Sequence, residues 1–107
     1  MLNKAKMSQI LRRAGFEASK QTTTAVRGWY NFSRGYLVEA CDDEGKFVRV
    51  SQRSNSHSEM SKETARNDVA LYASALIALG FNVHFAHAED DARHGHVLYV
   101  SEYATEA

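Results

Sequence analysis

The chain of 107 residues has no proline, a single cysteine and no long apolar run. Without proline it has no rigid Pro-rich linker and no X-Pro isomerisation phase. With Cys41 alone it forms no intramolecular disulfide, which suits a reducing compartment, and we expect a cytoplasmic location. No stretch approaches the roughly 18 apolar residues of a membrane span. The basic N-terminus lacks the apolar region of a secretory signal, so we expect no membrane association.

Motifs of catalysis and of metal binding are also lacking. The sequence has no GxSxG, HExxH, phosphate-binding loop or dinucleotide signature, and a chain this short leaves little room for a deep pocket. Histidines and acidic residues do gather near the C-terminus, but their spacing matches no established zinc pattern. We therefore expect a non-enzymatic protein without a metal or other cofactor. The gathered residues are His84, His87, Glu89, Asp90, Asp91, His94 and His96.

What is present is the composition of a globular protein, with 44% hydrophobic and 24% charged residues. This length suffices for one domain, which we expect to span residues 1–107. The net charge is zero but unevenly distributed. Residues 1–34 carry seven basic residues and one acidic residue, whereas residues 35–107 carry six basic and twelve acidic ones. Such asymmetry indicates either an anionic partner for the N-terminal part or pairing between the two parts across the fold.

Residues 61–81 show the clearest helical periodicity in the chain. Ser61 is a suitable N-cap, and Gly80 followed by Phe81 can end the helix with a left-handed residue and an aromatic packed on the last turn. Apolar residues cover so much of the circumference that we expect deep burial, or a partner in addition to the sheet. The expected core face is Ala65, Val69, Tyr72, Ala73, Leu76, Ile77 and Gly80, with Leu71, Ala75, Ala78 and Leu79 on a second apolar face.

The remaining elements are an N-terminal first helix and five strands rich in β-branched and aromatic residues. The first helix ends on the similar pair Gly15 and Phe16. The order α-β-β-β-α-β-β predicts an α+β fold, in which an antiparallel sheet of about five strands packs against one long helix as a two-layer sandwich. Val48 and Val50 are expected in the core. The expected helices cover 4–14 and 61–81, and the expected strands cover 23–30, 36–41, 46–52, 82–87 and 96–102.

Aromatic and basic residues alternate between Arg27 and Tyr36, across a predicted hairpin. Aromatic faces can stack on unpaired bases while arginines meet phosphates, so this hairpin and the basic first helix indicate a nucleic-acid-binding module. Cross-strand aromatic pairs that stabilise the sheet explain the pattern better, so nucleic-acid binding is kept as the alternative. Trp29 alternates with Tyr30 and is expected on the sheet face away from the long helix. If it is exposed there beside Arg27, it would be a binding hot spot.

The S-K-x-x-A-R pattern at 61–66 resembles the start of the second helix of double-stranded RNA-binding domains. In that family this helix start meets phosphates across a groove, so the resemblance implies phosphate contacts for Lys62 and Arg66. Three features depart from the family. Glu63 stands where a second lysine belongs, and the loop between the first two strands lacks the family's Gly-Pro-x-His signature. The hairpin over 82–102 has no counterpart in that fold.

Three stretches carry a wider resemblance: L-R-x-A-G-F at 11–16, V-R-G-W-Y-N-F-S-R-G-Y-L-V at 26–38, and Y-A-x-A-L-x-A-L-G-F at 72–81. In them the chain resembles small uncharacterised proteins of actinobacteria and their phages. These proteins carry no assigned activity, so the resemblance implies a small accessory protein.

Together these patterns favour a non-enzymatic binding protein, which in a phage would engage a host protein. A second copy of the chain is an alternative partner, and a nucleic acid is the alternative ligand. The candidate binding residues are Arg12, Arg13, Arg27, Trp29, Arg34, Lys62 and Arg66.

Overall fold

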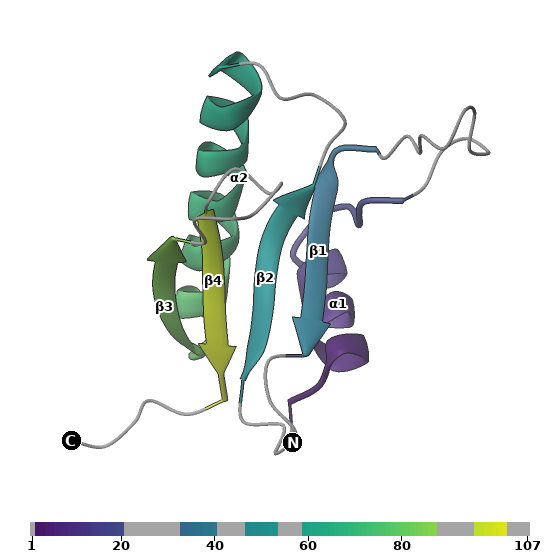
Figure 1. Cartoon of the computed structure of the whole chain (residues 1–107). Helices are drawn as coiled ribbons and strands as arrows, with labels where there is room; N and C mark the ends of the chain where they lie inside the picture. The colour runs from purple at the N-terminus through teal and green to yellow at the C-terminus, as the bar shows by residue number, and fades with distance from the viewer. Residues whose placement is uncertain (1, 21–32, 41–46, 54–58, 88–95, 103–107) are drawn as a thin grey trace.

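In the residues that the structure describes, the chain forms two helices and four strands (Figure 1). The structure is a computed structural model that describes residues 2–20, 33–40, 47–53, 59–87 and 96–102. The predicted α+β class is confirmed, and the strand expected over 23–30 lies outside the described residues. The elements are α1 (Lys4–Arg13), β1 (Gly35–Ala40), β2 (Val48–Arg53), α2 (Glu59–Ala78), β3 (Asn82–His87) and β4 (His96–Ser101).

The four strands form one antiparallel sheet in the order β1-β2-β4-β3. Residues directly opposite each other in antiparallel strands point to the same face of the sheet, so the register defines its two faces. Val38, Val50, Leu98 and Phe85 lie in one row across the four strands. This row points toward the helices, because Val50 and Leu98 belong to the core.

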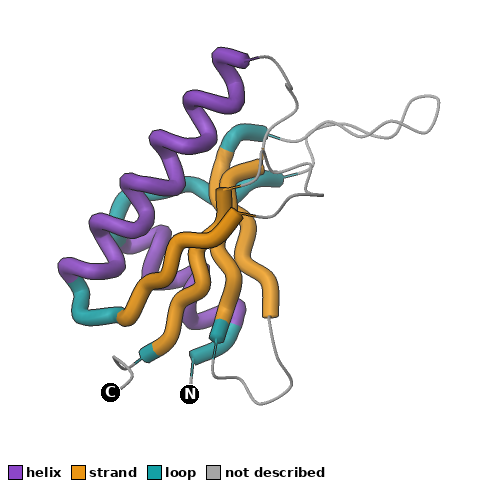
Figure 2. The backbone as a smooth tube through the Cα atoms, turned by 60° about the vertical axis from the view of Figure 1, so that its left-hand side comes forward, coloured by secondary structure: helices purple, strands orange, loops and turns teal. Residues whose placement is uncertain are grey.

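Both helices lie on the same face of the sheet, so the fold has two layers (Figure 2). The long helix α2 packs against β2, β4 and β3, whereas α1 packs against β1. The prediction of a sheet packed against one long helix is therefore wrong in this detail. A helix is only about 10 Å across, and four strands spaced about 4.8 Å apart are wider than that. A second helix is needed to cover β1.

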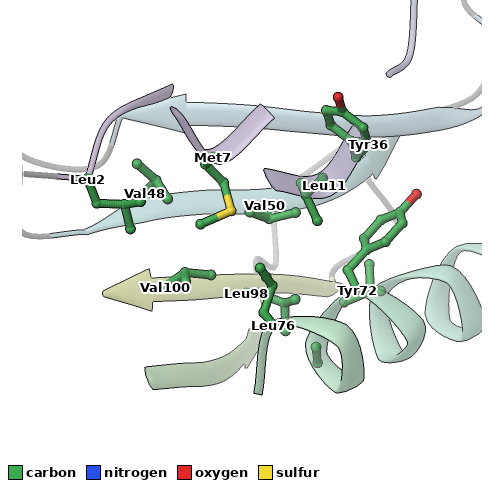
Figure 3. Close-up of a cluster of buried hydrophobic side chains, with 12 residues drawn as sticks. Leu2, Met7, Leu11, Tyr36, Val48, Val50, Tyr72, Leu76, Leu98 and Val100 are labelled. Carbon is green, nitrogen blue, oxygen red and sulfur yellow. The ribbon is translucent and has the colours of Figure 1, made fainter. Parts of the chain in front are cut away.

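The core lies between the helices and the sheet (Figure 3). Met7 and Leu11 of α1 and Leu76 of α2 have no exposed surface, and they pack on the inward side chains of β2 and β4. The predicted core positions of Leu76, Val48 and Val50 are confirmed. The buried residues of α1 are thus as deeply buried as those of α2. The core contains residues from near both ends of the chain, such as Leu2 and Val100.

Both helices end as predicted, with a glycine in the left-handed conformation followed by an aromatic residue. The φ angle is 93° at Gly80 and 100° at Gly15. At the end of α2 the Phe81 amide donates to the Leu76 carbonyl at 3.0 Å, and the Gly80 amide donates to the Ile77 carbonyl at 3.0 Å. This is the Schellman arrangement, and the end of α1 has the same two bonds. Each helix is therefore ended by its own local sequence.

The start of α2 differs from the prediction. The helix begins at Glu59, so Ser61 lies within the first turn and is not the N-cap. Glu59 and Met60 are good helix formers, and an acidic residue in the first turn suits the helix dipole. These two residues therefore extend the helix beyond Ser61. At α1 the cap is Asn3, whose Oδ1 accepts a hydrogen bond from the Lys6 amide at 2.8 Å.

Candidate binding surfaces

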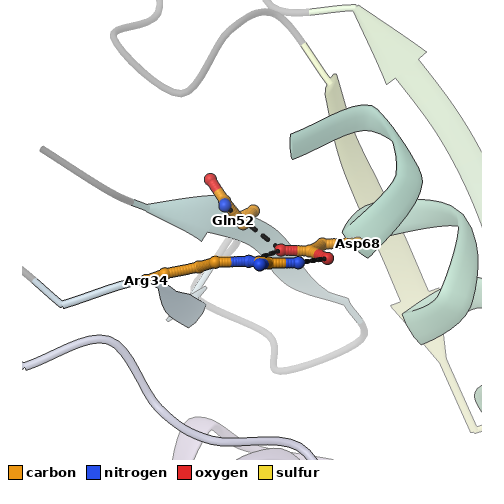
Figure 4. Close-up of polar contacts among 3 residues, drawn as sticks. All are labelled: Arg34, Gln52 and Asp68. Atoms are coloured by element: carbon orange, nitrogen blue, oxygen red, sulfur yellow. Dashed lines mark hydrogen bonds and ion pairs between the residues drawn. The ribbon is translucent and has the colours of Figure 1, made fainter. Parts of the chain in front are cut away.

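Arg34, immediately before β1, forms a two-point ion pair with Asp68 of α2 (Figure 4). The Nε atom of Arg34 donates to Oδ2 of Asp68 at 2.8 Å, and Nη2 donates to Oδ1 at 2.6 Å. The hydrogen bonds with Asp68 raise the pKa of Arg34. Burial acts to raise the pKa of Asp68, but the bonds from Arg34 and Gln52 outweigh it and hold that pKa below its ordinary value. The positive charge of Arg34 is therefore neutralised by the nearly buried carboxylate of Asp68.

Gln52 of β2 completes this group. It is 1% exposed, and its Nε2 donates to Oδ2 of Asp68 at 3.2 Å. Its Oε1 has no hydrogen-bond partner among the described residues. Exchanging the two amide atoms would remove the bond to Asp68, because only the nitrogen can donate to a carboxylate. The Asp68 contact therefore fixes the orientation of the Gln52 amide, at the cost of an unpaired buried oxygen.

Tyr72, one helical turn after Asp68, packs against two other aromatic rings. The Tyr72 ring of α2 meets Phe16 edge to face at a centroid distance of 4.8 Å and Tyr36 of β1 at 6.4 Å. The Tyr36 hydroxyl donates to the Ser8 carbonyl at 2.9 Å. Burial, and then the charge of Asp68, raises the pKa of Tyr72 well above its ordinary value. The Arg34–Asp68 pair thus lies near the largely buried Tyr72 and connects the start of β1 to α2.

A concavity of about 480 Å³ lies where the chain leaves α1 and approaches β1. Residues 17–20 run beside the start of β1 in a parallel arrangement (Figure 1), with the Tyr36 amide bonded to the Glu17 carbonyl at 3.0 Å. A Cβ atom on Gly35 would lie within 2.5 Å of this backbone, so only glycine permits the approach. The concavity is lined by Arg12, Phe16, Glu17, Ala18, Lys20 and Ser33.

Two cations in this lining have no acidic partner. Within the part of the chain that the structure describes, neither the Arg12 guanidinium nor the Lys20 ammonium is bonded to a carboxylate. Other cations are neutralised: Lys6 lies 3.1 Å from Glu102, and Arg49 lies 3.0 Å from Glu39. Arg12 lies in the last turn of α1, where a cation also suits the helix dipole. The described lining thus carries two positive charges and the one negative charge of Glu17, which leaves it net positive.

Another candidate binding surface is the outer edge of the sheet at β3. Among the described strands, β3 pairs with β4 alone, and it lies at the left edge of the sheet in Figure 1. Its six residues, N-V-H-F-A-H, contain no Asp, Glu, Lys, Arg or Pro. Phe85 of this strand is 52% exposed, and Ile77 and Leu79 at the end of α2 are each 59% exposed. The β3 edge is thus uncharged apart from its histidines and carries one large, half-exposed apolar side chain, Phe85.

Of the predicted binding residues, the structure describes the surroundings of Arg12, Arg13, Arg34 and Arg66. Arg12 and Arg13 are exposed in the last turn of α1, and Arg34 is bonded to Asp68. Arg66 is exposed on α2 two residues before Asp68, and residues two apart lie on different sides of a helix. The fold therefore places Arg66 away from Arg34. Arg27, Trp29 and the side chain of Lys62 lie outside the described residues.

Three important residues were absent from the prediction: Lys20, Asp68 and Gln52. Asp68 had a signal in the sequence, since it stands among the apolar residues Ala65, Val69 and Tyr72 of the buried helix face. An acidic residue in such a position needs a partner. Lys20 and Gln52 had no comparable signal, because their roles depend on chain segments that only the fold brings near. The sequence pattern alone does not identify such contacts.

The described ranges contain neither a metal-binding cluster nor a membrane-spanning helix. There, no three His, Cys, Asp or Glu side chains gather so that they could hold a metal ion. No helix among these residues is long and apolar enough to cross a bilayer. Residues 88–95, which hold much of the histidine and acidic cluster noted in the sequence, lie outside these ranges.

Comparison with known proteins gives no match. No family model, no curated protein and no solved structure is similar to the chain. The function of the chain has therefore to be inferred from the geometry of its own residues.

Proposed function

We propose that this chain is a non-enzymatic protein-interaction module that binds an extended, uncharged segment of another protein along β3. In a phage the partner would be a host protein. The observation that carries the proposal is the open edge of β3, whose outer backbone groups have no partner strand among the described elements. A strand added there would form main-chain hydrogen bonds and place alternate side chains against the module.

The composition of β3 supports this role. Proteins protect a sheet edge with lysine, proline, a bulge or a covering segment, because an open edge recruits other strands. Within the described residues β3 has none of these, and it is uncharged apart from its histidines. At the other edge of the sheet, residues 17–20 cover the start of β1, and Glu39 of that strand is charged. The two edges therefore differ, and β3 is the one suited to a partner.

The exposed side chain of Phe85 adds a second contact. It points from β3 toward the helix layer and is 52% exposed. Exposed apolar groups that cluster beside polar backbone are typical of protein interaction sites. A partner strand on β3 would cover the Phe85 ring with its own inward side chains. Backbone pairing and apolar burial would then act together.

Phe85→Lys tests this proposal, because a lysine on an edge strand prevents strand addition. The matched control is Phe47→Lys, which makes the same change at a phenylalanine that is 38% exposed before β2. Proteins are captured from host lysate on each variant, with and without nuclease. We expect the wild type and the control to retain one protein after nuclease treatment and Phe85→Lys to lose it. Equal capture by both variants would exclude β3 as the site, and a second copy as the retained protein would identify a homodimer.

Nucleic-acid binding is a second candidate, favoured by Arg12 and Lys20, which have no carboxylate partner among the described residues. Binding to phosphates releases counterions, so affinity for an oligonucleotide would fall steeply between about 50 and 200 mM salt. Strand addition at β3 depends little on salt, because it rests on backbone bonds and apolar burial. The salt dependence of binding therefore separates the two functions.

A further inference from the structure

We propose that the concavity between α1 and β1 binds a small phosphate monoester through Arg12 and Lys20. This site is independent of the strand-binding edge at β3 and lies beside the opposite edge of the sheet. It would give the module a ligand-binding function in addition to its protein partner.

The charge at the concavity is the first argument. The ion pairs of the fold leave Arg34, Arg49 and Lys6 neutralised, whereas Arg12 and Lys20 have no carboxylate partner in the described part of the chain. Both line one cavity. An arginine can bond two phosphate oxygens through its planar fork, and a lysine adds a compact charge. The two together match a phosphate group better than a single negative charge such as a carboxylate.

The second argument is the rigidity of the backbone that carries Lys20. The Lys20 amide donates to Oγ of Ser33 at 2.9 Å, and the Ser33 amide donates to the Lys20 carbonyl at 2.8 Å. The neighbouring Ser19 hydroxyl donates to the Ser33 carbonyl at 2.7 Å and accepts from Nε of Arg53 at 2.9 Å. These bonds hold the segment before any ligand arrives, so little conformational entropy is lost on binding.

The remaining lining residues define the rest of the ligand. Glu17 also lines the concavity without an ion pair among the described residues. Its carboxylate can accept hydrogen bonds from ligand hydroxyl groups, and it would repel a second negative group. Phe16 offers an apolar wall, and a volume of about 480 Å³ is in the range of small-molecule sites. The ligand is therefore a compact molecule with one phosphate and several hydroxyl groups.

Calorimetric titration of the full chain with AMP tests the site, with adenosine as the ligand that lacks the phosphate. We expect saturable binding of AMP and none of adenosine. Arg12→Gln and Lys20→Gln should each weaken AMP binding about tenfold, since each removes a charge-assisted bond. The matched control is Arg13→Gln, an exposed arginine of the same helical turn that does not line the concavity. It should change the affinity less than about twofold, as expected for a screened surface charge.

Two further measurements sharpen the test. Glu17→Gln should tighten the binding of inorganic phosphate, because it removes the negative charge from the lining. The NMR signals of the backbone amides of Lys20 and Ser33 should shift on titration with AMP.

The proposal is overturned if AMP shows no saturable binding, or if Arg13→Gln weakens AMP binding as much as Arg12→Gln does. It is also overturned if an oligonucleotide without a terminal phosphate binds more tightly than AMP, because the cations would then serve a nucleic-acid backbone.

Discussion

Three arginines that look alike in the sequence have different surroundings in the fold. Arg34 is held by both carboxylate oxygens of Asp68. Arg12 lines a concavity and has no carboxylate partner in the described residues, whereas Arg66 lies on a different side of α2 from Asp68. The same residue type is thus structural at one position and available to a ligand at another. Charge counted along the chain does not make this distinction, because it depends on which residues the fold brings together.

The Arg34–Asp68 pair predicts a defined dependence of stability on pH. Because the pKa of Asp68 is lower in the folded state, its contribution is present above the unfolded pKa of about 3.9. It is lost as the pH falls through the folded value. Asp68→Asn should therefore lower the free energy of unfolding at pH 7 and remove part of its decline below about pH 4. The loss at pH 7 should be about 1–2 kcal/mol, reduced from that of a buried pair since the Arg34 side chain is 62% exposed.

Urea unfolding of the two proteins at a series of pH values measures this effect. Glu63→Gln is the control, because Glu63 is an exposed acid of the same helix. It should change the free energy of unfolding by less than about 0.5 kcal/mol. Parallel pH profiles for the wild type and Asp68→Asn would show that the pair contributes nothing to folding.

At the scale of the elements, the helix ends were predictable and the helix faces only in part. Gly15 and Gly80 end their helices as their sequences predict, because the Schellman bonds involve only neighbouring residues. Ile77 and Gly80 were expected in the core beside Leu76, but both are exposed, Ile77 by 59%. Consecutive helical residues point about 100° apart. The single sheet face under α2 can therefore bury Leu76 without burying Ile77.

Alanine substitutions at these neighbouring positions test the assignment of the two faces. Leu76→Ala should reduce the free energy of unfolding by about 2–5 kcal/mol, because it leaves a cavity in a site with no exposed surface. Ile77→Ala should cost less than about 1 kcal/mol, since its side chain is already mostly in solvent. Chemical unfolding measures both values. Similar losses at the two positions would contradict the orientation of α2 on the sheet.

For the strands, the positions along the chain were predictable from local sequence, but the pairing between distant strands was not. The segments 36–41, 46–52, 82–87 and 96–102 were each predicted within two residues of β1, β2, β3 and β4. Their positions followed from local composition and turns. The pairing of β2 with β4 was not specified, because these strands are joined through α2 and β3. It is this pairing that places β3 at an edge, so the proposed site depends on a contact that no local pattern indicated.

At the scale of the whole molecule, the two edges of the sheet face different surroundings. The start of β1 is flanked by residues 17–20 and the basic concavity, whereas β3 is an uncharged strand without a further neighbour among the described strands. The helices cover one face of the sheet in both regions (Figure 2). The proposed protein partner and the proposed phosphate ligand therefore occupy opposite edges. Both could bind at the same time.

Hydrogen exchange of the β3 backbone amides tests strand addition most directly. In an antiparallel sheet, alternate amides of an edge strand point to its neighbour and the others point outward. In the free protein, the amides of Asn82–His87 that are bonded to β4 should be protected and the outward ones should exchange quickly. Adding the captured partner should protect the outward amides, while amides of β1 keep their rates. Outward β3 amides that still exchange quickly in the complex would contradict strand addition as the function of this protein.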